Sequence, residues 1–346
     1  MPSRLVPEMP STTQRLPRGL SAGVVWLLLA TQGTAGEAQG NPSLDRAAFK
    51  QAAASTAWSD VFFDTCTADW RANWFLDGEV GTVTNSPEGM TLTAGPEFRN
   101  DAHHLVLWTK ASFEGDLKIE YDYTRLDEAA NCVTILYIQA TGSGVGPYAK
   151  DIAQWSGLRR VPAMKVYFDH MNTYHISYAA NPGSDNAYIR GRRYMPEKQG
   201  LRGTGLKPDY AAKELFATGV LHRITVIKQD RDLFLRIENP DQIVYCHMTN
   251  PDLPPVTDGR IGIRHMFTRS ARYANFCVSR PNQGNKHGAN DASNFLRKGP
   301  LWQWCSAPKL LHKQRGSQIV SLRERPAAGW VREPSAPPTF MKAPSP

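Results

Sequence analysis

Residues 259–276 read GRIGIRHMFTRSARYANF. The first half of this stretch predicts a β-strand, because its side chains alternate between two characters. One predicted face holds Ile261, Ile263 and His265, and the other holds Arg260, Arg264 and Met266. The glycines at 259 and 262 suit a turn and a close approach between backbones.

The same stretch concentrates cations beside a histidine and a tyrosine. Residues 260–273 contain Arg260, Arg264, His265, Arg269, Arg272 and Tyr273. Planar guanidinium groups bind carboxylates through paired hydrogen bonds, so this density favours an anionic ligand. The alternative is a solvated basic strand end, and charge alone does not separate the two.

Strand patterns recur on the N-terminal side of this stretch. Six segments alternate or run apolar in the manner of strands: residues 117–123, 133–139, 174–178, 222–228, 233–237 and 243–247. Residues 82–93 predict a hairpin around the turn-like NSPEG. No long helical period or βαβ rhythm occurs. The sequence therefore predicts an all-β protein, an antiparallel β-sandwich or jelly roll.

Length and charge narrow the choice of partner. The chain has 346 residues, 41% of them hydrophobic, and a formal net charge of +8. One large sheet domain with a sizeable core fits this length. The charge suits nucleic acid, an anionic membrane or an acidic polysaccharide. No run of Lys and Arg typical of nucleic-acid binding occurs in the predicted domain. Charge alone therefore does not choose the partner. Together with the resemblance and the site residues given below, it leads us to expect an acidic oligo- or polysaccharide, not nucleic acid or, after signal cleavage, a membrane.

Composition divides the chain into four parts. Residues 1–38 read as a secretory signal peptide, because arginines precede the apolar run 20–30 and small residues follow it. Residues 39–57 are a predicted spacer or short helix, and residues 58–279 the predicted sandwich. Residues 280–346 are a predicted, mostly disordered tail with an unexplained LWQW at 301–304. We expect a secreted or periplasmic protein; a retained N-terminal anchor is the alternative.

Cysteine and histidine spacing predicts no metal centre. The five cysteines lack any C-x-x-C spacing, which argues against a zinc ribbon or a thioredoxin-type site. Export permits disulfides, and buried free thiols are the alternative. His103–His104 and the pair His170 and His175 have no third ligand at metal spacing.

Several motifs are similar to those of known proteins. The pieces GPEF (95–98), NDAHH (100–104), YIQATGSG (137–144), MNTYHISY (171–178) and RHMFTRSARY (264–273) resemble the YesU-like family of bacterial proteins. FEGDL (113–117) and GRIGIR (259–264) are similar to the concanavalin-like lectin and glucanase superfamily. This resemblance, over about residues 58–279, implies a concanavalin-like jelly roll that takes part in breaking down acidic polysaccharides. It transfers no catalytic residues. The superfamily often carries a structural calcium ion, which Asp64 could bind; no other cofactor is expected.

The residue types match an eliminative lyase. Such an enzyme neutralises a uronate carboxylate, removes the C5 proton and protonates the leaving oxygen. The predicted carboxylate clamps are Arg264 and Arg269, and the predicted acid is Tyr167. His175 is the predicted base, since alternation places it opposite the core-facing Tyr174. The alternative bases are His104 and His265, and further predicted substrate-binding residues are Lys165, Arg190, Arg193 and Tyr194.

Two other functions fit the sequence. A glycoside hydrolase needs paired carboxylates, and the segment 114–122 carries Glu114, Asp116, Glu120 and Asp122 on one face. Lys118 between them would pair with its neighbours and lower their pKa values, which does not suit a general acid. A non-catalytic binder needs aromatic platforms, which Trp108, Trp155 and Tyr148 in predicted loops would supply.

The N-terminal pattern generates a first prediction. Protein exported by its natural host should lack about the first 35–40 residues, because a signal peptidase removes such a segment. N-terminal sequencing of the exported protein checks this. An intact Met1 in a cytoplasmic pool would contradict it.

Overall fold

The computed structural model describes residues 40–131 and 133–282. The predicted signal peptide, Cys132, Cys305 and the predicted tail beyond residue 282, with its LWQW segment, lie outside the described residues. Within the described ranges no helix is long and apolar enough to cross a bilayer.

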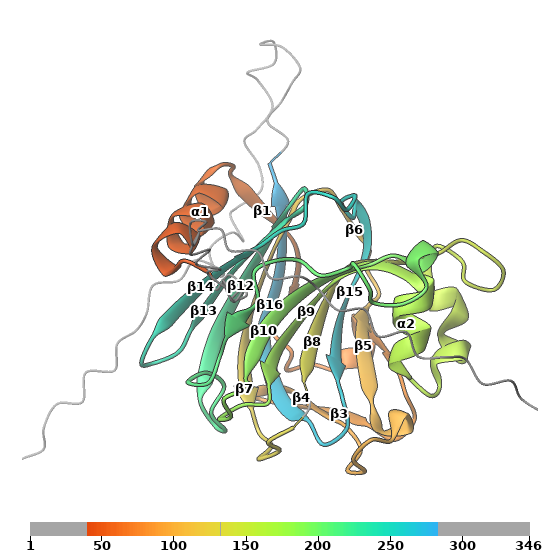
Figure 1. Ribbon diagram of the computed structural model, residues 1–346. Helices are drawn as coiled ribbons and strands as arrows, with labels where there is room; N and C mark the ends of the chain where they lie inside the picture. Colours follow the sequence, from red (N-terminus) through yellow and green to blue (C-terminus); the bar gives the residue numbers. More distant parts are fainter. Residues whose placement is uncertain (1–39, 132, 283–346) are drawn as a thin grey trace, which may run out of the picture. The chain divides into compact units, whose positions relative to one another are not determined.

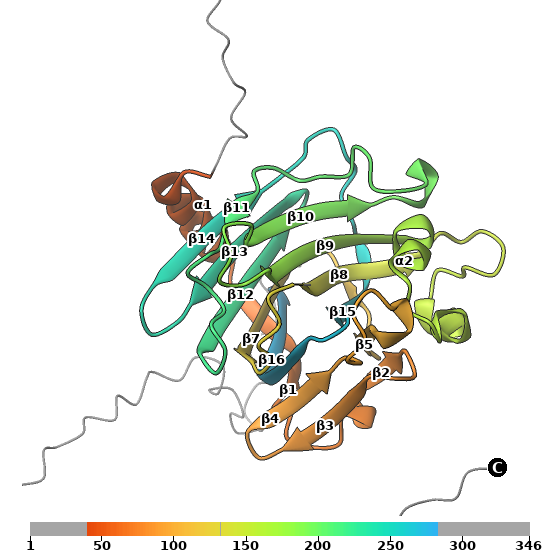
Figure 2. The same ribbon diagram turned by 60° about the horizontal axis from the view of Figure 1, so that its bottom comes forward.

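The predicted strands form two antiparallel sheets (Figures 1 and 2). Sheet A has the order β14 (Ile243–Met248), β13 (Asp232–Glu238), β12 (Leu221–Gln229), β7 (Leu117–Arg125), β16 (Ser270–Pro281), β4 (Gly89–Thr93) and β3 (Thr82–Ser86), with β1 (Trp58–Asp64) also paired to β16. Sheet B has the order β11 (Tyr210–Ala211), β10 (Tyr188–Tyr194), β9 (Met171–Ala180), β8 (Thr134–Gly142), β15 (Asp258–His265), β5 (Leu105–Thr109) and β2 (Trp74–Asp77), with β6 (Phe113–Glu114) also paired to β15. The fold is the predicted antiparallel β-sandwich.

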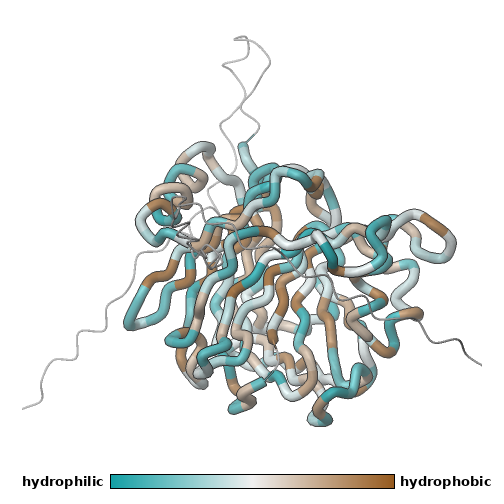
Figure 3. Tube along the Cα trace, in the orientation of Figure 1, coloured by the Kyte–Doolittle hydropathy of each residue, from teal (hydrophilic) through white to brown (hydrophobic). Residues whose placement is uncertain are grey.

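Alternation places the core between the sheets, as predicted. In β7 the side chains of Leu117, Ile119, Tyr121 and Tyr123 are buried and belong to the main core. From sheet B, Ile261 and Ile263 of β15 enter the same core. Apolar residues are spread along the strands, whereas many connecting loops are hydrophilic (Figure 3). Burial of these two inner faces is the main force that holds the sheets together.

Helix α1 (Pro42–Ala54) covers part of the outer face of sheet A. Asn41 caps its first turn, accepting hydrogen bonds from the backbone N–H of Ser43 and Leu44. Phe49 packs with Ile227 and Phe234 of the sheet. The predicted spacer 39–57 is therefore largely this helix, which docks on the domain. At the other boundary, β16 continues two residues beyond the predicted end at residue 279 and reaches Pro281.

A second cover lies over the outer face of sheet B. It consists of the 3₁₀ helix η3 (Ile152–Arg159) and helix α2 (Met164–His170). The shorter 3₁₀ turns are η1 (Trp70–Ala72), η2 (Asp101–His103) and η4 (Pro196–Lys198). Side chains of the cover, including Trp155 and Tyr167, form one buried cluster with Trp108, Ile135 and Tyr137 of the sheet. Strand β8 is consequently buried on both faces, which explains its nearly continuous apolar sequence.

A buried carboxylate fastens this cover to the sheet. Asp77 of β2 accepts hydrogen bonds on Oδ2 from Arg159 Nε at 2.5 Å, Trp108 Nε1 at 2.7 Å and Tyr167 OH at 3.0 Å. Arg159 also donates to the backbone oxygen of Ile152 at 2.9 Å. Its guanidinium lies 4.1 Å from the ring centroid of Trp155. The side chains of Asp77 and Arg159 are both 0% exposed, so neither charge can be satisfied by water.

Buried thiols and imidazoles complete the interior. Cys66 and Cys246 are buried free thiols, the second alternative left open by the sequence. Burial raises the pKa of Cys66 to about 12, so this thiol is unreactive. Burial, together with the nearby arginines 264 and 269, lowers the pKa values of His104 and His265 to about 3.

The Asp77–Arg159 pair yields a stability prediction. Asp77→Ala should lower the free energy of unfolding by about 3–5 kcal/mol, because it leaves a buried guanidinium without its anion. The matched control is Glu79→Ala, which removes the partner of Arg160 in a pair whose side chains are 55% and 72% exposed. That change should be undetectable by urea denaturation. Equal effects of the two substitutions would show that the buried pair does not hold the cover.

The buried histidines predict a stability that falls with acidity. The folded-state pKa values of His104 and His265, about 3, lie below the ordinary value of 6.5, so below pH 6.5 the unfolded chain binds more protons. Each group should then reduce the free energy of unfolding by up to about 1.4 kcal/mol per pH unit between pH 6.5 and 3. Urea denaturation at pH 7.5, 6.5 and 5.5 measures the slope. His265→Gln should flatten it; an unchanged slope would contradict the assignment.

Candidate functional site

The strand pair β9–β10 presents a polar set of side chains on the outer face of sheet B. In β9, Tyr174 and Ile176 enter the core, which turns His175 and Ser177 to the other face, as the alternation predicts. In β10, Ile189 enters the core. Arg190, Arg192 and Tyr194 consequently share the outer face with His175.

His175 is held between two hydroxyl groups. Its Nε2 lies 2.5 Å from Ser177 Oγ, and its Nδ1 is hydrogen-bonded to Tyr194 OH. His175 is 3% exposed, Ser177 5% and Tyr194 0%. Ser177, His175 and Tyr194 therefore form a chain of hydrogen bonds. Of the three side chains, Ser177 is the most exposed.

Two arginines of β10 lie beside this chain. Arg192 is paired in register with His175, and its half-buried side chain makes no hydrogen bond or ion pair with any described residue. Arg190 differs, since its Nε donates to Asp209 Oδ2 at 2.6 Å and its guanidinium lies 4.5 Å from the ring centroid of Tyr188. Arg192 is thus the cation that remains available for a ligand.

Electrostatics keep His175 and Tyr194 uncharged. Burial lowers the pKa of His175 well below 6.5, and the charges of Arg192, Arg264 and Arg190 lower it further. Burial also raises the pKa of Tyr194 well above 10, although Arg264 and Arg192 act in the opposite direction. At neutral pH the site therefore combines a neutral imidazole, a neutral phenol and cationic side chains.

Arg264 lies beneath the cover, deeper in the same face. It is 0% exposed, its Nη2 lies 2.7 Å from His104 Nδ1, and it also donates to the backbone oxygen of Pro162. Its guanidinium is 4.6 Å from the ring centroid of Tyr167. Its Nε and Nη1 have no hydrogen-bond partner among the described residues. Arg264 therefore supplies positive potential to the site from a position that no ligand reaches directly.

The structure does not bring the remaining predicted lyase residues into this site. His265 faces the opposite side of sheet B, where its Nε2 lies 2.7 Å from Tyr273 OH. Arg269 is also buried and pairs with Asp127 at 3.1 Å. The hydroxyl of Tyr167 is committed to Asp77, as described above. All three side chains therefore make contacts within the protein.

Other predicted binding residues are also used within the fold. Arg193 faces away from Arg192 and donates to the backbone oxygen of Pro254 at 3.1 Å. Lys165, 78% exposed, forms an ion pair with Asp169. The predicted aromatic platforms Trp108 and Trp155 are buried, because Trp108 lies in β5 and Trp155 in η3, not in loops. A sugar ring therefore has no access to either indole.

The carboxylates considered for hydrolysis or calcium have protein partners. Lys118 pairs with Glu120 at 2.8 Å, as expected, and Arg223 pairs with Asp122 at 3.1 Å on the outer face of sheet A. Asp64 accepts three N–H bonds, from Cys66, Asn73 and Trp74. In the described part of the chain no three His, Cys, Asp or Glu side chains could hold a metal ion.

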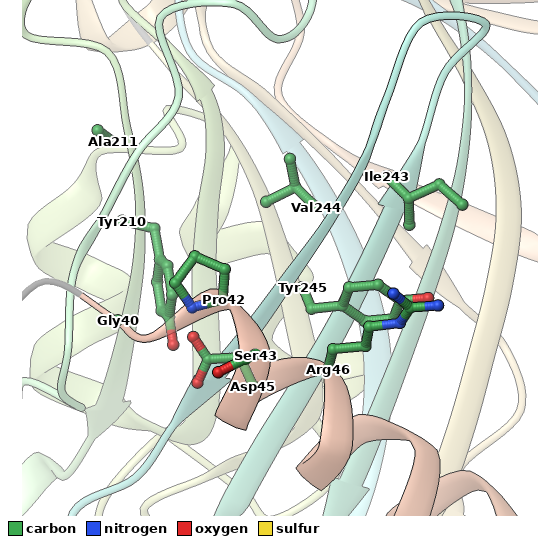
Figure 4. A pocket seen from close by; sticks show the side chains of 10 residues that line it. All are labelled: Gly40, Pro42, Ser43, Asp45, Arg46, Tyr210, Ala211, Ile243, Val244 and Tyr245. Atoms are coloured by element: carbon green, nitrogen blue, oxygen red, sulfur yellow. The ribbon is translucent and has the colours of Figure 1, made fainter.

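Two open pockets lie outside this strand face. One, of about 650 Å³, lies at the start of α1, where Asp45 points toward the hydroxyl of Tyr210 and Arg46 lies along Tyr245 (Figure 4). The other, of about 480 Å³, lies between the loop 143–148, the end of α2 and η4. Tyr148, a predicted aromatic platform, lines this second pocket.

Sequence analysis named Arg190, Tyr194 and His175 as candidate site residues but did not include Arg192 or Ser177 among them. Strand parity in the sequence indicates that both residues lie on the outer face. Arg192 has the same strand parity as Arg190 and Tyr194, and Ser177 has the same parity as His175. Strand parity does not predict the pairing register between β9 and β10, and this register sets Arg192 opposite His175.

The chain was compared with known proteins and with solved structures. No curated protein matches the chain by sequence. A protein of unknown function with a galectin-like fold from Bacillus subtilis aligns with a TM-score of 0.49 and 17% identity, over 64% of this chain and 97% of that one. The carbohydrate-binding module CBM66 from Bacillus subtilis gives 0.37 and 12%, over 60% and 96%. Lectin I-B4 from Griffonia simplicifolia, metal-free, gives 0.42 and 8%, over 65% and 100%.

A family model described as Domain of unknown function (DUF1961) matches residues 64–278. The match begins at the end of β1 and ends within β16, so it covers both sheets and the cover of sheet B. It does not bear out the narrower YesU-like name. Because the match spans more than half of the chain, the protein belongs to the DUF1961 family.

Proposed function

We propose that the protein binds an acidic oligosaccharide on the outer face of sheet B and that Arg192 holds a carboxylate of the sugar. The observation that carries this proposal is the guanidinium of Arg192, half-buried and without a partner among the described residues. A cation that is partly removed from water gains most from an anion that completes its hydrogen bonds. A carboxylate matches its planar fork.

The surroundings of Arg192 favour the same kind of ligand. Arg190 lies two residues away on the same face, and the buried Arg264 adds positive potential from below. Together these cations lower the pKa of His175, and the same field attracts an anion to this face. The sugar is proposed by analogy with the lectin-like jelly roll, whereas the acidic group is proposed from the arginines.

Elimination at the same site is the second candidate, favoured by the Ser177–His175–Tyr194 chain. In that reaction the C5 proton of a uronate passes to His175, the C4–O bond breaks, and a C4=C5 double bond forms. The leaving oxygen takes its proton from Tyr194. A carboxylate at Arg192 would raise the pKa of His175 and so strengthen it as a base.

Binding stands first because the proton carriers are buried and weak. His175 is 3% and Tyr194 0% exposed, which leaves little access for a glycosidic oxygen. The pKa of His175 is lowered by burial and that of Tyr194 is raised by burial, so neither titrates near neutral pH. With the signal-type N-terminus predicted from sequence, we propose that binding takes place in the periplasm or outside the cell.

Substitution of Arg192 tests the proposal. Arg192→Ala should weaken binding of an oligouronate about tenfold to a hundredfold in isothermal titration calorimetry, since a hydrogen bond to a charged group contributes about 1.5–3 kcal/mol. Arg192→Lys should recover only part of this, because it lacks the planar fork. The control is Arg223→Ala, a partly exposed arginine on sheet A, which should leave affinity unchanged.

The same samples separate binding from elimination. An unsaturated uronate absorbs in the ultraviolet, so a rising absorbance that His175→Gln abolishes would establish elimination in addition to binding. A flat trace with saturable binding supports a binder. The proposal fails if Arg192→Ala leaves affinity for the oligouronate unchanged, or if it weakens the carboxyl-reduced analogue equally.

A further inference from the structure

The pocket of about 480 Å³ lies at the end of the strand pair that carries Arg192. Its lining includes Tyr148, Asp169, His170, Asn172, Glu197 and Gln199. Asn172 belongs to β9, three residues before His175, and η4 with Glu197 follows directly after β10. Because a strand rises about 3.3 Å per residue, Asn172 lies about 10 Å along the strand from His175 and its partner Arg192.

The pocket holds one carboxylate without an ion-pair partner among the described residues, Glu197, whereas Lys165 pairs with the other, Asp169, and Arg193 contacts the lining residue Asn172. Its lining contains two carboxylates and no Lys or Arg. The exposed carboxylate of Glu197 makes no ion pair with any described residue. Asp169 is 3% exposed. Its Oδ2 forms an ion pair with Lys165 Nζ, whereas its Oδ1 has no hydrogen-bond partner among the described residues.

The other lining groups suit an uncharged sugar. Tyr148 is partly exposed and stacks on His170 with ring centroids 3.6 Å apart. Burial lowers the pKa of His170, so this ring is neutral at pH 7 and does not offset the carboxylates. Aromatic rings pack against the C–H face of a sugar, and carboxylates and amides such as those of Asn172 and Gln199 bind its hydroxyls.

Resting on the proposed function, we infer that this pocket is a subsite for a neutral sugar residue joined to the acidic residue held at Arg192. The preferred ligand is then an oligosaccharide in which uronate and neutral residues alternate, and not a chain of uronates alone. A second uronate in the pocket would bring its carboxylate close to Glu197, where like charges repel. The single strand pair thereby selects for charge at one end and against it at the other.

Three oligosaccharides of equal length provide the test: one with alternating uronate and neutral residues, one of uronates only, and one neutral. Calorimetry at fixed salt should show the alternating oligosaccharide binding on the order of tenfold more tightly than the uronate-only one. Glu197→Lys should reduce this ratio to near one by improving the uronate-only ligand, and Glu197→Gln should reduce it partly. Glu214→Gln, at an exposed carboxylate outside the pocket, is the control and should keep the ratio.

The outcomes separate this inference from the proposed function. If Arg192→Ala weakens both acidic ligands but Glu197→Lys leaves their ratio unchanged, the subsite inference is wrong and the carboxylate site stands. Equal affinity of the unaltered protein for the two acidic ligands also overturns the inference. If Arg192→Ala changes neither affinity, the carboxylate site itself is wrong, and the subsite inference that rests on it falls as well.

Discussion

The buried pair of Asp77 and Arg159 is the interaction on which the arrangement of sheet B depends. A jelly-roll sheet has an inner face in the core and an outer face that water would otherwise solvate. Here η3 and α2 close much of the outer face, and their contact includes charged side chains with 0% exposure. Such a pair stabilises the cover only while both partners are present, since either charge alone is expensive to bury.

Covering the outer face changes the chemistry of the side chains beneath it. His175, Tyr194 and Arg264 would be ordinary polar groups on an open sheet. Burial instead keeps His175 and Tyr194 neutral and leaves Arg264 as a cation hydrogen-bonded to neutral groups. In surroundings of low dielectric constant its field extends further than it would in water. We propose that a ligand meets this field at the partly exposed Arg192.

The strand pair β9–β10 links two surfaces of opposite character. At its middle Arg192 is the cation without an ion-pair partner among the described residues, since Arg190 pairs with Asp209. At its end Glu197 is the pocket carboxylate without such a partner, since Asp169 pairs with Lys165. In the proposed binding mode, attraction at one position and repulsion at the other would give selectivity that total buried area cannot provide. The neutral His175 between Ser177 and Tyr194 is compatible with a site shaped for binding, in which polar groups are satisfied before the ligand arrives.

The sequence by itself determined most of the long strands and their inner and outer faces, and hence the antiparallel sandwich, because side-chain direction in a strand has a period of two that can be read locally. It missed β10, and it placed Trp108 of β5 in a loop. It also placed His175 opposite Tyr174. Only the tertiary structure decided which distant groups meet. Arg264 and Arg269 are five residues apart, yet Arg269 pairs with Asp127 whereas Arg264 lies beside His104 beneath the cover. The contacts of Asp77 with Arg159 and Tyr167 arise from packing between segments far apart in the chain. The register that sets Arg192 beside His175 depends on how the neighbouring strands β9 and β10 pair. No local pattern records such contacts, because their free energy exists only when both segments are in place.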